Sequence, residues 1–161
     1  MDVFEAIRTR RSVRQFTGEA IPREDLEKIV DAGRLAATGS NRQPWEFIVI
    51  TDRAMIEQLK TAAQWMEKAA AIIAVVMDPE SRWWVEDGAA AVENMLLAAT
   101  ALGYGSCWLE GYTLRYEDTF KTLLGIPAGK RLMTLVPIGV PVAWPTKEKK
   151  SLEEIIHWER Y

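Results

Sequence analysis

The 161-residue chain is poor in side chains that bind metals or form cross-links, because it has one cysteine and one histidine. A zinc or iron–sulfur site within one chain needs several such ligands, so we expect no metal. The one cysteine, Cys107, cannot form an internal disulfide. The stretch from Met1 to Glu5 lacks the basic and then apolar regions of a signal peptide. We therefore expect a protein of the reducing cytoplasm.

The chain also lacks an excess of basic charge and a long uninterrupted apolar run. Its formal net charge of −3 and its sequence pI near 5.3 argue against nucleic acid as a partner, because nucleic-acid-binding domains usually carry a basic surface. Glu93 and Asn94 interrupt the longest apolar stretch, which excludes a membrane span. No linker or repeat divides the chain, and 48% hydrophobic residues suffice for a core. We expect one domain over residues 1–161.

The apolar pattern predicts helices and strands in irregular alternation, which is typical of an α+β fold. Helices are expected from the capping pair Asp2 and Glu5, from Pro22 to near Gly39, from Asp52, over 88–102 and over 114–124. Strands are expected over 47–50, 70–77, 104–109 and 131–138. The strand over 70–77 is apolar on both faces and needs cover on both sides. Pro137 indicates an edge position or an early end for the last strand.

Four arginines, at positions 8, 10, 11 and 14, lie within seven residues of this acidic chain. Guanidinium groups bind phosphate bidentately, and Ser12 adds a hydroxyl between them, so the segment favours a phosphorylated ligand. The alternative is a solvated basic turn, and Arg8 is expected at the surface. A second stretch, Thr38 to Phe47, places small, amide and turn-forming residues just before an apolar run. An Asx turn without a ligand would also explain that stretch.

Together the two stretches resemble the nitroreductase family of FMN-dependent NAD(P)H oxidoreductases, in which Arg-Arg/His-Ser-x-Arg/Lys is followed by Asn-x-Gln-Pro-Trp. The resemblance continues over 101–111 and 147–154, so it covers nearly the whole chain. It implies an α+β fold with a central mixed, mostly antiparallel sheet flanked by helices. It also implies a homodimer with FMN at the interface and a C-terminal arm, residues 140–161, exchanged between subunits. The apolar end of that tail separately indicates that it docks on something.

The resemblance also implies the cofactor-binding residues, and no side chain is expected to be catalytic because FMN carries the chemistry. The implied residues are Arg10, Arg11, Ser12, Arg14, Thr38, Gly39, Asn41, Gln43, Trp108, Leu109, Glu110, Gly111, Lys147 and Lys149. Arg14 would face the pyrimidine end of the ring and stabilise reduced FMN. Asn41 would reach the flavin from the other subunit, and Gly111 would leave room beside flavin N5. Lys150 could replace Lys149 at the phosphate.

The implied activity is transfer of hydride from NADH or NADPH, by a ping-pong mechanism, to a small-molecule electron acceptor such as a nitroaromatic or a quinone. Two alternatives stay open: reductive dehalogenation on the same scaffold, and a flavin-binding or sensing module. Trp83 and Trp84 lie where larger family members carry an insertion over the flavin; they could cover the ring or pack under the long helix, and we favour packing. Trp45 is expected in the core, and Cys107 is expected to be a small buried residue.

Overall fold

The structure is a computed structural model that describes the backbone of residues 1–161 and every side chain except those of Tyr112 and Leu114. Within this part, four strands form one antiparallel sheet in the order β1-β2-β4-β3. Their bounds are β1 (Trp45–Ile50), β2 (Ala71–Met77), β3 (Gly105–Ser106) and β4 (Arg131–Gly139). One parallel bridge joins Ser12 to Ser106 beside β3. The predicted α+β fold, with a mostly antiparallel sheet flanked by helices, is confirmed.

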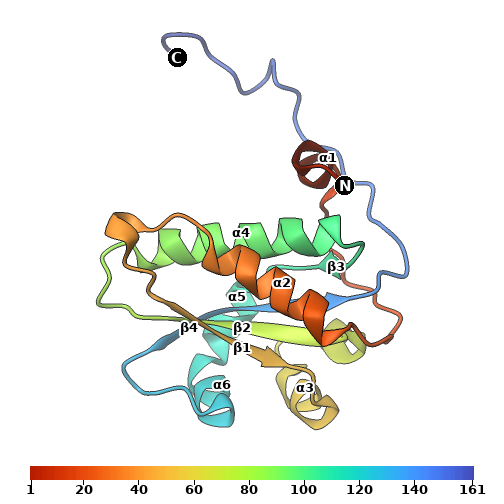
Figure 1. Ribbon diagram of the computed structural model, residues 1–161, viewed down its shortest axis with the longest axis vertical. Helices are drawn as coiled ribbons and strands as arrows, with labels where there is room; N and C mark the ends of the chain where they lie inside the picture. The colour runs from red at the N-terminus through yellow and green to blue at the C-terminus, as the bar shows by residue number, and fades with distance from the viewer.

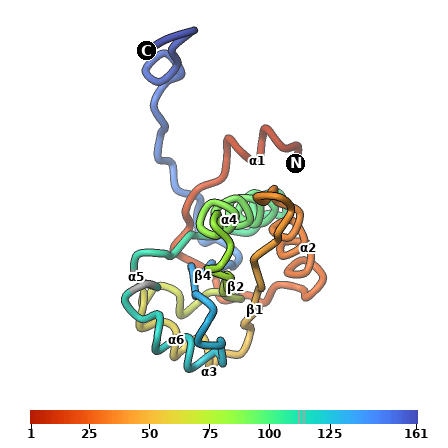
Figure 2. The backbone as a smooth tube through the Cα atoms, turned by 90° about the vertical axis from the view of Figure 1, so that its left-hand side faces the viewer, coloured from red at the N-terminus to blue at the C-terminus, as the bar shows by residue number. Residues whose placement is uncertain are grey.

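Helices cover both faces of the sheet (Figures 1 and 2). The helices α2 (Arg23–Arg34) and α4 (Trp84–Ala101) lie on one face, and α3 (Arg53–Leu59) and α6 (Glu117–Leu124) lie on the other. The remaining helical segments are α1 (Val3–Thr9), α5 (Gly111–Arg115) and the 3₁₀ turns η1 (Gly39–Asn41) and η2 (Gln64–Lys68). Every residue of β2 is buried: Ile72 packs in the core on the α3 and α6 face, whereas Ile73 packs under α2 and α4. The prediction of a two-sided apolar strand is confirmed.

Capping side chains begin two of the predicted helices. Asp2 Oδ1 accepts from the Glu5 N–H at 2.9 Å, and Asp52 Oδ1 accepts from the Met55 N–H at 2.8 Å. The predicted end of α2 near Gly39 is wrong, because the chain leaves the helix at Leu35 to enter η1. The predicted start of α4 at residue 88 is also wrong. That helix begins at Trp84, whose ring packs against the core and under the Arg131 guanidinium.

Three further predictions are wrong in detail. The strand expected over 104–109 is limited to β3, and the helix expected over 114–124 is broken at Tyr116 between α5 and α6. The strand β4 is interior, although Pro137 indicated an edge. The Pro137 carbonyl accepts from the Cys107 N–H at 3.2 Å, and the N–H and C=O of one strand residue point the same way. The side of Pro137 that lacks an N–H therefore faces the end of β3, and no hydrogen bond between β4 and β2 is lost.

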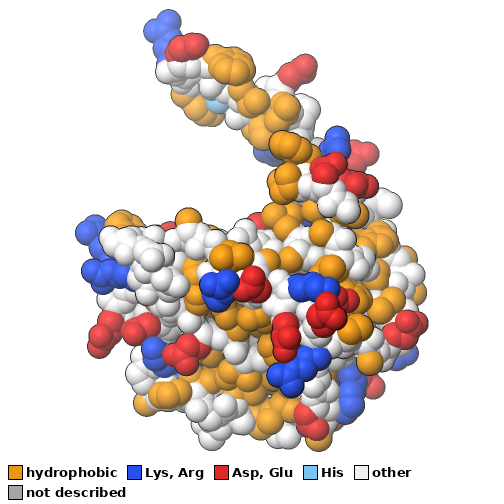
Figure 3. Space-filling model, viewed as in Figure 1, with side chains coloured by type: hydrophobic (Ala, Val, Ile, Leu, Met, Phe, Trp, Pro, Cys, Tyr) orange, Lys and Arg blue, Asp and Glu red, His pale blue; other side chains and the backbone are white. Residues whose placement is uncertain are grey.

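The last residues form an extended arm that projects from the body of the molecule, with apolar side chains along it (Figure 3). Leu152, Trp158 and Tyr161 are 68%, 78% and 104% exposed. The exposed apolar side chains Phe4 and Ile7 of α1 lie at the same end of the molecule. Among the described residues, no helix is long and apolar enough to cross a membrane.

A bidentate ion pair ties α6 to β4. Arg131 Nε lies 2.7 Å from Glu117 Oε1, and Arg131 Nη2 lies 2.9 Å from Glu117 Oε2. Glu117 Oε1 also accepts from the Leu132 N–H at 3.0 Å. The hydrogen bonds from Arg131 lower the pKa of the Glu117 carboxyl below its usual value, although partial burial opposes this.

Replacing Glu117 by Gln should lower the free energy of unfolding by about 1–2 kcal/mol at pH 7, because charge-assisted hydrogen bonds are lost. Since the folded pKa lies below the unfolded one, this stabilisation is present above the unfolded pKa and is lost as pH falls through the folded pKa. Urea unfolding of both proteins at pH 7 and at successively lower pH measures the difference. Exposed Glu80→Gln is the matched control. A loss of unfolding free energy in Glu117→Gln that does not change with pH would contradict this account.

Candidate functional site

The arginine-rich segment leaves α1 and runs in an extended conformation between β3 and the C-terminal tail. The Val13 N–H donates to the Ser106 carbonyl at 2.9 Å, and the Thr17 N–H donates to the Val140 carbonyl at 2.9 Å. The side chains of Val13 and Phe16 are buried, whereas Arg14 and Gln15 are exposed. Backbone pairing and buried apolar anchors therefore fix a segment whose polar side chains face outward.

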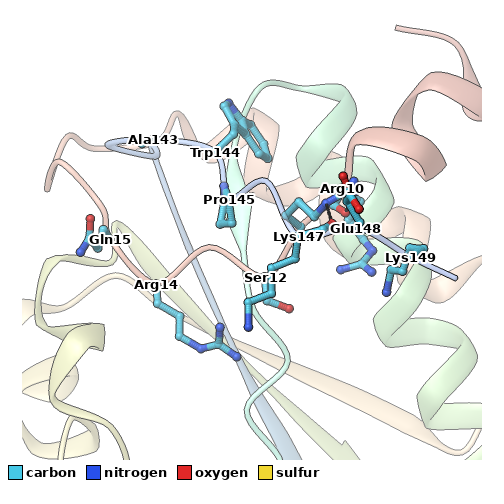
Figure 4. Close-up of a pocket in the computed structure, with 11 residues that line it drawn as sticks. Arg10, Ser12, Arg14, Gln15, Ala143, Trp144, Pro145, Lys147, Glu148 and Lys149 are labelled. Atoms are coloured by element: carbon cyan, nitrogen blue, oxygen red, sulfur yellow. Dashed lines mark hydrogen bonds between the residues drawn. The ribbon is translucent and has the colours of Figure 1, made fainter.

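A cavity of about 570 Å³ lies between this segment and the tail (Figure 4). Its lining comes from both ends of the chain: Arg10, Arg11, Ser12, Arg14, Gln15, Ala143, Trp144, Pro145, Lys147, Glu148 and Lys149. Five of these residues are cations and one is an anion, so the lining carries a formal net charge of +4 at neutral pH. Such a cavity, which we call the cationic pocket, is suited to a phosphate group.

Two of the pocket arginines are already engaged within the chain. Arg11 donates from Nε to the Lys147 carbonyl at 3.0 Å, and from Nη1 to the Arg8 and Arg10 carbonyls at 2.7 and 2.8 Å. Arg11 therefore ties the tail to the first segment. Arg10 Nε lies 3.1 Å from Glu93 Oε1 of α4, which orients its guanidinium at the pocket wall. Arg8 is exposed, as expected.

Arg14 lies at another part of the pocket. Its Cζ is 5.9 Å from the centroid of the Trp65 ring, and this cation–π contact helps to orient an otherwise exposed side chain. Burial raises the pKa of the Cys107 thiol, more than the charge of nearby Arg14 lowers it. Cys107 thus stays a neutral thiol, and its predicted role as a small buried residue is confirmed.

The resemblance over residues 101–111 includes β3, whose Ser106 pairs with Ser12 of the pocket segment, but none of its residues lines the pocket. Leu109 is buried and pairs with Leu135. Trp108 and Glu110 are half-buried, and the buried Trp108 Nε1 has no hydrogen-bond partner among the described residues. Gly111 is exposed, and a Cβ built on it would meet no described atom within 4 Å. The packing of the described chain therefore does not require a glycine at position 111.

One loop lies at the N-terminal end of α4 (Figure 1) and contains Thr38, Gly39, Asn41 and Gln43. The Gly39 N–H donates to Asp87 Oδ1 at 3.0 Å. A Cβ on Gly39 would lie 2.6 Å from Trp83 Cδ1, so the loop packs directly on that ring. None of the four loop residues lines the cationic pocket, and within one chain the structure does not bring Asn41 to Arg10.

The loop has an unusual backbone. Ser40, Asn41 and Gln43 have φ angles of 53°, 55° and 50°, and the left-handed region costs about 1–3 kcal/mol for a residue other than glycine. The side chains of these three residues are exposed. The Gln43 N–H donates to Thr38 Oγ1 at 3.3 Å, which closes the loop. The Asn41 amide is thus presented to solvent from a strained but internally bonded loop.

Trp45 is buried in the core, as predicted. Trp83 and Trp84 were expected to pack, and both do so: Trp84 lies against the core, and Trp83 lies against Gly39 although it stays 45% exposed. Sequence reasoning missed Gln15, Trp144 and Glu148 in the pocket lining. It also missed the contacts of Glu93 with Arg10 and of Asp87 with Gly39, because each joins residues that are distant in sequence. Among the described residues, no group of three His, Cys, Asp or Glu side chains could hold a metal ion.

Sequence comparison links the chain to known proteins. The sequence model of the Nitroreductase family matches residues 7–71 and 57–140. A provisionally named NADH dehydrogenase/NAD(P)H nitroreductase of Archaeoglobus fulgidus is 40% identical over an alignment of 162 residues. That alignment covers 95% of this chain and 90% of the archaeal protein.

Solved structures with bound FMN are also similar. A provisionally named nitroreductase of Desulfovibrio desulfuricans, in complex with FMN, has a TM-score of 0.88 and 30% identity, over 100% of this chain and 98% of that one. A nitroreductase of Bacteroides fragilis with bound FMN has a TM-score of 0.85 and 28% identity, over 99% and 100% of the two chains.

Proposed function

Because the chain belongs to the nitroreductase family, we propose that it takes hydride from NADH or NADPH and reduces a nitroaromatic, a quinone or a related small acceptor by a ping-pong mechanism. It is an FMN-dependent oxidoreductase, as its FMN-bound structural relatives indicate. The observation that carries the proposal is the cationic pocket, where arginines near one end of the chain meet lysines near the other. A buried single cysteine agrees with a reducing cytoplasm as its location.

The described residues fit FMN in three respects. The pocket has a formal charge of +4, which suits the phosphate. The stretch beside Ser12 leaves Ser106 Oγ and Trp108 Nε1 buried without partners among the described residues. Gly111 keeps open space that the packing of the described part of the chain does not explain. In the chain alone, the grouped charges and the unpartnered polar atoms lower stability, and the glycine has no packing role. A bound ligand would give each of these features a function.

FMN supplies the two-electron redox chemistry when it is bound. In our proposal Arg10, Ser12, Lys147 and Lys149 hold its phosphate, and Arg11 keeps the tail in place through the Lys147 carbonyl. Trp108, Leu109, Glu110 and Gly111 belong to the wall beside the flavin ring. Arg14 lines the same pocket, and its guanidinium would favour the reduced cofactor if it faced the part of the ring that gains electron density.

We propose a homodimer in which the arm and the Asn41 loop complete the partner's site. The apolar side chains of the arm are exposed, which is costly unless another surface covers them. The Asn41 loop is remote from the pocket of its own chain, so a second chain is needed to bring Asn41, with Thr38, Gly39 and Gln43, to the cofactor.

A chain that ends at Lys150 keeps the whole lining of the pocket but loses the apolar end of the arm. Sedimentation velocity should show the full chain at twice its mass of 18.2 kDa and the shortened chain as a monomer or an aggregate. A shortened chain that remains a stable dimer would rule out the proposed role of the arm.

The proposed activity is tested with the FMN-loaded protein under anaerobic conditions. NADH or NADPH should bleach the flavin absorbance in the absence of an acceptor, and a nitrofuran or a benzoquinone added afterwards should restore it. This order of events is expected because one site serves donor and acceptor in turn. Bound FMN that neither nucleotide reduces would contradict the proposal and favour the flavin-binding or sensing module. Recovery with a haloaromatic alone would favour reductive dehalogenation.

Under the same anaerobic conditions, Arg14→Met should lower the reduction potential of bound FMN. The expected shift is roughly 30 mV for each 1.4 kcal/mol by which Arg14 favours reduced over oxidised FMN. A redox titration against a reference dye measures the shift. Arg8→Met, which removes an exposed arginine outside the cationic pocket, is the matched control and should leave the potential unchanged. An unchanged potential in Arg14→Met with FMN fully bound would place Arg14 away from the ring.

A further inference from the structure

Asp87 is a buried carboxylate that the proposed function does not use. It is the fourth residue of α4 and is 5% exposed. Its Oδ1 accepts from the Gly39 N–H at 3.0 Å, whereas its buried Oδ2 has no hydrogen-bond partner among the described residues. A buried carboxylate with one oxygen left without a hydrogen bond lowers the stability of the fold, so stability alone does not explain this residue. We infer that Asp87 is a positioning residue that holds the Asn41 loop for the cofactor of the partner subunit.

The contact of Asp87 replaces a cap that the loop itself does not supply. Thr38 precedes the 3₁₀ turn η1 at the N-cap position, but its side chain makes no capping hydrogen bond. The carboxylate of Asp87 instead accepts the first N–H of η1 from a helix 48 residues away in the sequence. A negative group at this end of a helical turn is favourable, because the N–H groups there point outward without partners.

The base of the loop is fixed at further points on α4. Trp83 is the N-cap residue of α4 and lies four positions before Asp87, and both contact Gly39. Asn94 Nδ2 donates to the Ala32 carbonyl of α2 at 3.0 Å, which fixes the helix before the loop. The exposed side chain of Asn41 is therefore held by α4 through Gly39 rather than by contacts of its own.

The inference rests on the proposed function, in which Asn41 contacts FMN bound by the other subunit. Asp87 does not touch that cofactor in this account, so its effect on binding must pass through Asn41. This requirement gives a test that separates positioning from a general contribution to stability: the two residues must act as one unit in a double-mutant cycle.

The test measures the dissociation constant of FMN by quenching of flavin fluorescence in the wild type, Asp87→Ala, Asn41→Ala and the double variant. Each single variant should bind FMN about tenfold more weakly, which is the loss expected for one hydrogen bond, and the double variant should bind no more weakly than Asn41→Ala. Asp87→Asn keeps an oxygen that can accept from the Gly39 N–H and should restore binding. The neighbouring exposed Glu86→Ala is the control and should bind as the wild type does.

Effects of Asp87→Ala and Asn41→Ala that add in the double variant would overturn the inference, because Asp87 would then act by another route. Wild-type affinity in either single variant would also overturn it. A wild-type protein that does not bind FMN would instead overturn the proposed function itself, so the two failures are distinct. If Asp87→Ala does not fold, Asp87→Leu replaces it, since leucine has a similar branched shape and accepts no hydrogen bond.

Discussion

The backbone hydrogen bonds that join the Arg10–Thr17 segment to β3 and to the tail hold the walls of the cationic pocket together. They place arginines near the start of the chain beside lysines near its end, with Arg11 reaching the Lys147 carbonyl across 136 positions of sequence. The grouped cations repel one another. The burial of apolar side chains such as Val13 and Phe16 opposes this repulsion and keeps the segment in place. An anion in the pocket would relieve it, so binding of a phosphorylated cofactor and attachment of the tail should be coupled.

In the proposed homodimer, the same arrangement gives each chain a use for a second copy. The tail that forms one wall of the pocket continues into the exposed arm, so pocket and arm share one segment of backbone. At the N-terminal end of α4, Asp87 fixes the Asn41 loop, and the residues of this loop do not line the pocket of their own chain. In our proposal each subunit therefore contributes two separate surfaces, one to its own cofactor and one to its partner's.

Most of the fold could be predicted from the sequence, because its signals are local. The two-sided apolar strand β2, the cap at Asp2 and the helix start at Asp52 follow from residue type and spacing, and the structure agrees. The arginine motif likewise predicted the pocket segment. The interior position of β4 was missed because Pro137 is tolerated only through its place beside the short β3, which no local pattern shows. The contacts of Asp87 and Arg11 were missed for the same reason, since each joins residues that are distant in sequence.

The central claim is that the cationic pocket holds the phosphate of FMN, and comparison of FMN with riboflavin tests it most directly. The two ligands share the ring and the ribityl chain, so a difference in affinity reports the phosphate alone. Calorimetric titration of the apoprotein should show FMN binding at least about tenfold more tightly than riboflavin, because each charge-assisted contact contributes roughly 1.5–3 kcal/mol. Arg10→Gln should reduce that difference. Equal affinities for FMN and riboflavin in the wild type would contradict the account.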